Sequence, residues 1–330
     1  MESAAGKGRY AGAVLAEVVR SGFVEGWHTG SVVGLAADGS VALSAGTPSA
    51  PVFPRSSNKP MQAAGMVRAG LAVDAELLAL AAASHSGEPF HLDGVQRILA
   101  GAGLDESALR CPADLPLDEQ ERAAWLRAGR APEPLAMNCS GKHAAMLATC
   151  VAAGFDTASY LDAGHPLQVL LRREVEDLAG EPVAAVGVDG CGAPLFAVSL
   201  VGLARAFATM ATADAGFPAG LVAAAIRTHP ERLGGTRRDV TALLRAVPGL
   251  VAKDGAEGVY AAATADGRAV ALKIDDGAAR ARRPVVVAAL RHLGVDAPGL
   301  DAVAAAPLYG GGRQVGEVRA TLPAAWADPD

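Results

Sequence analysis

Residues 28–46 read "HTGSVVGLAADGSVALSAG", and this stretch decides the predicted fold. Two β-prone runs flank Asp38-Gly39, a residue pair typical of the tight turn in a β-hairpin. The stretch "GVYAAATADGRAVALKIDDG" at 258–277 repeats the pattern around Asp266-Gly267. The two hairpins lie toward opposite ends of the chain, so we expect strands from both ends to share one antiparallel sheet.

The chain between the two hairpins has mostly helical patterns. Asp74 is placed to cap a helix that begins at residue 75. Further helices are predicted over 91–103, 118–129, 165–180, 199–212, 217–229, 236–246 and 279–293. Short apolar stretches at 183–188 and 249–253 are consistent with strands. The predicted fold class is therefore α/β (α+β), as one domain over 1–330; two lobes dividing near residue 200 are the alternative.

Composition narrows the function classes. With 330 residues, 51% of them hydrophobic, the chain can bury a large core. A net charge of −6 without a basic cluster argues against nucleic acid as a partner. The longest apolar run, 190–204, contains glycines and a proline and is too short to span a bilayer. Residues 1–10 lack a signal-peptide pattern, so we expect a cytoplasmic location and no membrane partner.

The four cysteines are not arranged in close-spaced pairs. In a reducing cytosol, such cysteines are expected as buried thiols or metal ligands, not as disulfides. They are Cys111, Cys139, Cys150 and Cys191.

The lysines are the most informative residues. Of 29 cationic residues only five are Lys, yet "PRSSNKPMQ" (54–62) keeps Lys59 three positions after Ser56. Arg is effectively always charged, whereas a buried Lys amine can lose its proton and act as a base. Residues i and i+3 share a helix face, so the amine could reach the hydroxyl. Pro60 favours a tight 3₁₀-like start; a capped surface helix is the alternative interpretation.

Other segments also concentrate reactive side chains. "NCSGKH" (138–143) brings Cys139, Lys142 and His143 together at a helix start, although Ser140 as an N-cap beside a buried cysteine is an alternative. "DGCGAP" (189–194) places Cys191 in a turn. Two thiolates and one amine could hold zinc as an unusual S₂N site that keeps a water. The usual zinc, phosphate-loop and nucleophile-elbow motifs are absent from the sequence.

Four blocks together carry a family resemblance: "RSSNKPMQ" (55–62), "ASHSGE" (83–88), "NCSGKH" and "DGCGAP". In this order and spacing the chain resembles the rhizobial-type (class 3) L-asparaginases of the asparaginase II family. The later segments "VAKDGAEGVYA" and "KIDDG" extend the likeness to about residue 277. The chain departs from the family pattern in Ala144-Ala145 and in a shortened, Ala-rich C-terminal end.

The resemblance implies a fold similar to serine β-lactamases and glutaminases. It also implies hydrolysis of L-asparagine to L-aspartate and ammonia by a homodimer. By motif, Ser56 would be the nucleophile with Lys59 as its base. Ser84 and Lys253 would form a second Ser-Lys pair that completes the proton relay.

The resemblance further implies a zinc ion and no organic cofactor. Cys139, Lys142 and Cys191 would hold one zinc per chain near the substrate. Asp189 and His85 would lie close to the substrate, with Arg55 supporting the site.

Two alternatives stay open at this stage. One is another β-lactamase-like amidohydrolase, such as a glutaminase or a β-lactam or peptide acyl hydrolase, although its usual Ser-Asp-Asn and Lys-Thr-Gly elements are missing. The other is a non-enzymatic zinc-binding protein, which should tolerate exchange of Ser56.

Overall fold

The computed structural model describes residues 12–321. Lys7 and the segment 1–10, on which the expected location rests, lie outside this range. Within residues 12–321 no helix has both the length and the apolar character needed to cross a membrane. The strands are β1 (Ala13–Arg20), β2 (Phe23–Leu35), β3 (Val41–Ala45), β4 (Pro51–Val52), β5 (Ala185–Val188), β6 (Pro194–Ser199), β7 (Val251–Asp254), β8 (Val259–Ala263), β9 (Ala269–Ile274), β10 (Pro307–Gly310) and β11 (Arg313–Ala320).

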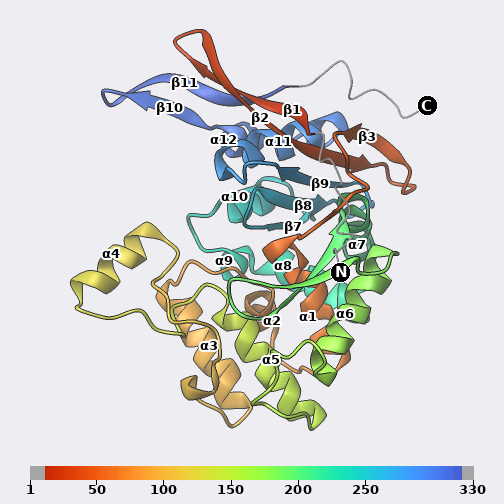
Figure 1. The fold of residues 1–330 in the computed structure, drawn as a ribbon, viewed down its shortest axis with the longest axis vertical. Helices are drawn as coiled ribbons and strands as arrows, with labels where there is room; N and C mark the ends of the chain where they lie inside the picture. The colour runs from red at the N-terminus through yellow and green to blue at the C-terminus, as the bar shows by residue number, and fades with distance from the viewer. Residues whose placement is uncertain (1–11, 322–330) are drawn as a thin grey trace, which may run out of the picture.

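Helices fill most of the remaining chain (Figure 1). They are η1 (Arg55–Asn58), α1 (Lys59–Arg68), α2 (Ala75–Ala81), α3 (Pro89–Gly101), η2 (Glu106–Ala108), α4 (Glu119–Arg127), α5 (Ser140–Ala153), α6 (Pro166–Ala179), α7 (Leu200–Thr212), α8 (Pro218–Thr228), α9 (Pro230–Leu233), α10 (Asp239–Ala246), α11 (Ala279–His292) and α12 (Leu300–Ala304). Asp74 caps α2 by accepting a hydrogen bond from Leu77 N, as the sequence predicts. The predicted helices are confirmed within a few residues at their ends.

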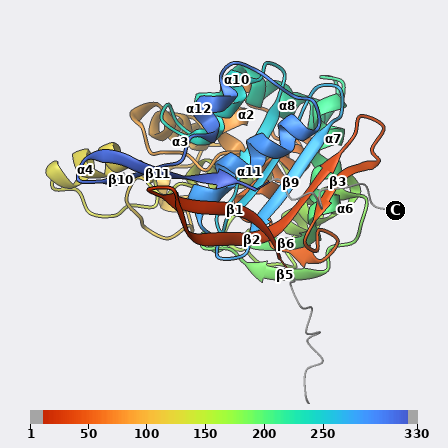
Figure 2. The same ribbon diagram turned by 90° about the horizontal axis from the view of Figure 1, so that it is seen from above.

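One antiparallel sheet joins the two ends of the chain. Its strand order is β10-β11-β1-β2-β9-β8-β7, with β3 also paired to β2. In the pairing of β1 with β11, Val18 lies opposite Val318. The mixed α/β class with terminal strands in a shared antiparallel sheet is therefore confirmed (Figures 1 and 2).

Both predicted hairpins are present. Strands β2 and β3 flank Gly39, which has a φ of 83°. Residues other than glycine rarely adopt this positive φ, which the tight turn requires. Strands β8 and β9 flank Gly267, with a φ of 95°. The apolar stretch at 183–188 forms β5, as predicted. The pairing of β5 in a small sheet β4-β6-β5, the strands β4 and β6, and the strands β1, β10 and β11 are additions that the sequence patterns did not predict.

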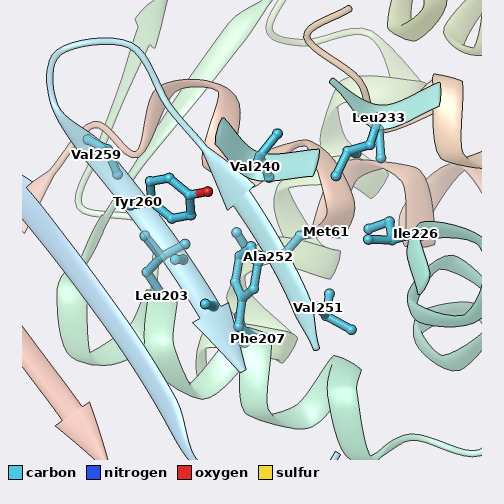
Figure 3. Packing of buried hydrophobic residues seen from close by; sticks show 14 of the residues in the cluster. Met61, Leu203, Phe207, Ile226, Leu233, Val240, Val251, Ala252, Val259 and Tyr260 are labelled. Carbon is cyan, nitrogen blue, oxygen red and sulfur yellow. The ribbon is translucent and has the colours of Figure 1, made fainter. Parts of the chain in front are cut away.

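The core lies against the inner strands of the large sheet. All residues of β7 and β8 are buried, as expected for strands covered on both faces. Helices α7 and α11 each pack against β8 and β9. Figure 3 shows side chains of α7, including Leu203 and Phe207, next to Ala252 of β7 and Tyr260 of β8.

A helical layer lies on the far side of α7 and α8 from the sheet, with α1, α2, α3, α5 and α6 in mutual contact (Figure 1). The short helix η1 contacts β7 and β8, so the chain enters α1 directly from the sheet surface. This junction between the sheet and the helical layer positions the candidate site.

Candidate active site

Lys59 is the first residue of α1 and is buried. It follows the 3₁₀-helix η1, which confirms the tight start predicted from Pro60. Its Nζ donates to Ala83 O at 2.6 Å, Ser84 Oγ at 3.0 Å and Cys139 Sγ at 3.0 Å. These three contacts match the number of hydrogen bonds that a lysine nitrogen can make. Lys59 thus connects α1 to the chain after α2 and to the start of α5.

The two candidate serines differ in access and in partners. Ser84 is 4% exposed and bonded to Lys59, whereas Ser56 is partly exposed. No hydrogen bond joins the Ser56 hydroxyl to Lys59 or to Lys253 within residues 12–321. The neighbouring Ser57 donates to Lys253 O at 3.1 Å and so fixes η1 against β7. The lysine three positions after Ser56 is therefore bonded to the other serine.

Lys253 lies in β7 and is completely buried. Its Nζ donates to Asp254 O at 2.7 Å and to Asp254 Oδ1 at 2.6 Å. Burial, opposed by Asp254, lowers the pKa of the Lys253 amine to about 8, and the charge of Lys59 acts in the same direction as burial. The hydrogen bond expected between Lys253 and Ser84 is not found within residues 12–321. Lys253 instead contacts Asp254, because a buried ammonium requires a carboxylate partner.

Asp254 is the centre of a buried ion network. Its Oδ2 accepts from Arg238 at 2.5 Å and from Arg282 at 3.3 Å, and Arg282 also pairs with Asp239 at 3.0 Å. Burial alone would raise the pKa of the Asp254 carboxyl, but Lys253 and the two arginines outweigh burial and hold it well below its usual value. The network keeps Lys253 in one position beside the site.

The three predicted metal ligands converge. Cys139 occupies the N-cap position of α5, Lys142 lies in its first turn, and Cys191 lies in the turn between β5 and β6. Lys142 Nζ lies 3.2 Å from Cys191 Sγ, and Cys139 Sγ lies 3.0 Å from Lys59 Nζ. Ser140 is not the N-cap, so that alternative is wrong: its hydroxyl donates to Leu135 O at 2.8 Å from within the helix.

The two thiols differ in protonation. The hydrogen bond from Cys139 and the charge of Lys142 hold the pKa of the Cys191 thiol far below its usual value. That shared hydrogen bond, together with burial, raises the pKa of Cys139 well above its usual value. Burial acts to lower the pKa of Lys142, but Cys191, Cys139 and Asp189 together outweigh burial and the pKa is raised. The cluster therefore holds a thiolate, a thiol and an ammonium.

These donors fit a zinc ion chemically. Two thiolates and one neutral amine, with a water, make up a four-ligand set of the soft and borderline donors that zinc accepts. Among residues 12–321 no group of three His, Cys, Asp or Glu could hold a metal ion. A metal at this cluster would depend on Lys142 as its third protein ligand, and binding would displace protons from Cys139 and Lys142.

Two buried histidines flank the cluster. His143 Nδ1 lies 2.7 Å from Tyr160 Oη, and His143 contributes to lowering the pKa of Cys191. His85 Nε2 lies 2.8 Å from Ser140 Oγ. Because the Ser140 proton goes to Leu135 O, His85 Nε2 must donate, which leaves Nδ1 as an acceptor without a partner in the described residues. Burial lowers the pKa of His85 well below its usual value, so the ring is neutral.

Arg55 and Asp189 form the partly exposed side of the site. Arg55 Nε donates to Asp189 Oδ1 at 2.9 Å, which connects η1 to the turn that carries Cys191. Arg55 has a φ of 52°, a strained conformation for a residue other than glycine. The structure thus brings these two predicted residues into contact, next to Ser56 in the chain.

Two glycines permit the close packing of the site. A Cβ at Gly141 would lie 2.6 Å from Leu80 O, so α5 can approach α2 only with glycine here. A Cβ at Gly255 would lie 2.7 Å from Pro54 O, which would push η1 away from β7. Both glycines belong to segments that carry the family resemblance, "NCSGKH" and "VAKDGAEGVYA".

Sequence reasoning missed the residues that support Lys253. Asp254 directly follows Lys253, and the sequence motifs assign it no role. A lysine predicted to be buried needs a counter-charge, and this requirement could have identified Asp254. Nothing in the sequence pattern indicates Arg238 or Arg282, which reach Asp254 from α10's N-terminus and from α11.

Comparison with known proteins gives one family match. A search of curated proteins found no match. The model of the family described as L-asparaginase II matches residues 16–320, which includes every residue discussed for the site. A match over almost the whole chain, combined with the clustered motif residues, establishes the relationship. The chain therefore belongs to the L-asparaginase II family and is an amidohydrolase acting on L-asparagine.

Proposed function

We propose that the chain hydrolyses L-asparagine through a covalent acyl-enzyme intermediate formed on Ser56, with buried lysines moving the protons. The observation that carries this proposal is the contact of Lys59 Nζ with Ser84 Oγ at 3.0 Å, made by the lysine three positions after the partly exposed Ser56. An amine within hydrogen-bond reach of a hydroxyl is the arrangement that activates serine nucleophiles. No organic cofactor is needed for this chemistry.

In the proposed reaction Ser56 Oγ attacks the side-chain amide carbon and passes its proton to the Lys59 amine, which acts as the base. The C–N bond then breaks, and ammonia leaves with a proton delivered through Ser84 and Lys59. Water adds to the ester, the C–Oγ bond breaks, and L-aspartate is released with the serine restored. Lys253, with a pKa of about 8, can also take part in neutral form near physiological pH.

The contact between Lys59 and Ser84 also supports a competing assignment, in which Ser84 is the nucleophile. Two considerations favour Ser56. Ser84 is 4% exposed, whereas Ser56 is partly exposed and follows Arg55, which faces Asp189. Catalytic hydrogen bonds often form only when substrate is bound, so the missing contact of Ser56 does not argue against it.

We also propose that Cys139, Lys142 and Cys191 hold one zinc ion close to the substrate. Bound zinc would supply a fixed positive charge that orients the substrate. The protein residues carry the proton transfers. A fold similar to serine β-lactamases, a homodimeric assembly and a cytoplasmic location remain predictions from the family resemblance.

The experiment that tests the proposed function is ammonia release from L-asparagine, compared with L-glutamine and a chromogenic β-lactam. We expect a strong preference for L-asparagine, because gripping the α-groups displaces the longer amide of L-glutamine from the serine. A misplacement of about 1 Å can cost on the order of a hundredfold in rate. Equal efficiency on both amides, or preferred cleavage of the β-lactam, would contradict the proposal.

A further inference from the structure

A cavity of about 500 Å³ is lined in part by Arg55. Val52 and Phe53 form its apolar wall. Arg55, Glu257, Lys273 and Asp275 supply its charged groups. Its size falls in the range of small-molecule sites, and such sites combine apolar walls with a few charged groups that fix orientation. Of the four charged residues, only Arg55 has been given a role above.

The charges of the cavity are balanced and lie close together. Arg55 Nη1 lies 3.7 Å from Glu257 Oε1, which is longer than a hydrogen bond. Lys273 Nζ donates to Glu257 O at 2.7 Å and to Ile274 O at 3.1 Å, so one of its three N–H groups remains for a ligand. Asp275 Oδ2 accepts from Thr29 at 2.9 Å, which holds that carboxylate in place. Two cationic and two anionic groups thus face one volume.

The backbone supports a binding role for the same residues. Arg55 has a φ of 52° and Glu257 a φ of 57°, a region that residues other than glycine rarely occupy. Such conformations persist only where surrounding structure enforces them, and they concentrate at ligand sites. Here two of them line one cavity, and Arg55 Nη1 lies 3.7 Å from Glu257 Oε1. The fold therefore aims both side chains at the cavity.

We propose that this cavity binds the α-ammonium and α-carboxylate groups of an α-amino acid substrate. Arg55 and Lys273 bind the carboxylate, and Glu257 and Asp275 bind the ammonium. A balanced set of charges suits a zwitterion better than a simple anion or cation. Arg55 lines this cavity and directly precedes Ser56, so we infer that a substrate held here places its side-chain amide near Ser56. The assignment rests on the proposed hydrolysis and adds the residues that select the substrate.

Glu257→Gln tests the ammonium side. The probes are L-asparagine and succinamate, which lacks the α-amino group and keeps the amide and carboxylate. Losing one charged hydrogen bond should lower kcat/KM for L-asparagine by about tenfold or more. The kcat/KM for succinamate should not change, because succinamate has no ammonium to bind. Glu119→Gln, in the exposed first turn of α4, is the matched control and should leave both values unchanged.

Lys273→Gln tests the carboxylate side in the same way. It should lower kcat/KM for L-asparagine and for succinamate by about tenfold or more, and leave 3-aminopropanamide, which lacks the carboxylate, unchanged. Equal losses on all three amides would overturn the assignment, because they would indicate a general structural effect.

Calorimetric titration of L-asparagine separates this inference from the proposed hydrolysis. The wild-type protein and Glu119→Gln should bind alike, and Glu257→Gln should bind about tenfold or more weakly, whether or not ammonia is released. Binding without ammonia release in the wild type would refute the hydrolysis and leave the cavity supported. Unchanged affinity in Glu257→Gln, or no binding by the wild type, would overturn the cavity assignment.

Discussion

Lys59 Nζ lies 3.0 Å from Ser84 Oγ, although the two residues belong to different parts of the helical layer. The same amine is 3.0 Å from Cys139 Sγ, so one buried lysine contacts both the proposed proton relay and the proposed metal site. A shift of α1 relative to α5 would disturb both sites together. The proposed relay and the proposed zinc ligands are therefore expected to respond together to substitutions around Lys59.

Lys→Arg exchange tests whether the buried lysines supply protons or only charge. Lys59→Arg and Lys253→Arg should each nearly abolish turnover, because Arg cannot act as a base at working pH and its planar group fits the space differently. Lys7→Arg serves as the control and should be silent. Steady-state kinetics on the three variants, with circular dichroism to check folding, decides the question. Folded variants at 59 and 253 with near-normal turnover would show that charge alone is needed.

The pH dependence of the rate should report Lys253. Its pKa is lowered to about 8 by burial, so the neutral amine is abundant above pH 8 and falls about tenfold per pH unit below it. We expect an ascending limb of kcat/KM centred near pH 8. Asp254 raises the pKa of Lys253, so Asp254→Asn should move this limb to lower pH.

Asp254→Asn also has an expected cost in stability. The substitution removes the buried carboxylate charge that Arg238 and Arg282 contact. Breaking a buried ion network in this way lowers the free energy of unfolding by about 3–5 kcal/mol. The limb should therefore be measured at a temperature where circular dichroism shows the variant folded. An unmoved limb in the folded variant would mean that a group other than Lys253 titrates.

Zinc content tests the metal site. The purified protein should contain about one zinc ion per chain, and Cys139→Ser and Cys191→Ser should each lose it because a hydroxyl is a poor replacement for a thiolate ligand. Cys150→Ser is a matched control, since this buried cysteine near the end of α5 is not part of the cluster. Elemental analysis gives the answer directly. Full zinc content in both cluster variants would rule out the proposed ligands.

The sequence predicted those parts of the fold that have local signals. Turn pairs such as Asp38-Gly39 marked the hairpins, and Asp74 marked the start of α2, because turns and caps depend on neighbouring residues. The strand β11 was missed: its sequence "RQVGEVRA" is half-exposed and polar, and only pairing with β1 makes it a strand.

The same distinction holds for the site. The motifs singled out Lys59, Cys139, Lys142 and Cys191. In the structure Lys59 contacts Cys139 and Lys142 contacts Cys191. The pairing of Lys59 with Ser84 was not predicted, because spacing along the chain indicated Ser56 and said nothing of residues 25 positions away. The supports of Lys253 depend on α10 and α11, whose contacts with Asp254 exist only in the folded protein.

The central claim is that an acyl-enzyme forms on Ser56. Rapid acid quenching during turnover of L-asparagine, followed by peptide mapping with mass spectrometry, measures it most directly. We predict a β-aspartyl adduct on the peptide that contains Ser56, and neither adduct nor ammonia release in Ser56→Ala, since loss of the nucleophile costs several orders of magnitude in rate. An adduct on Ser84, or steady ammonia release by folded Ser56→Ala, would contradict the account.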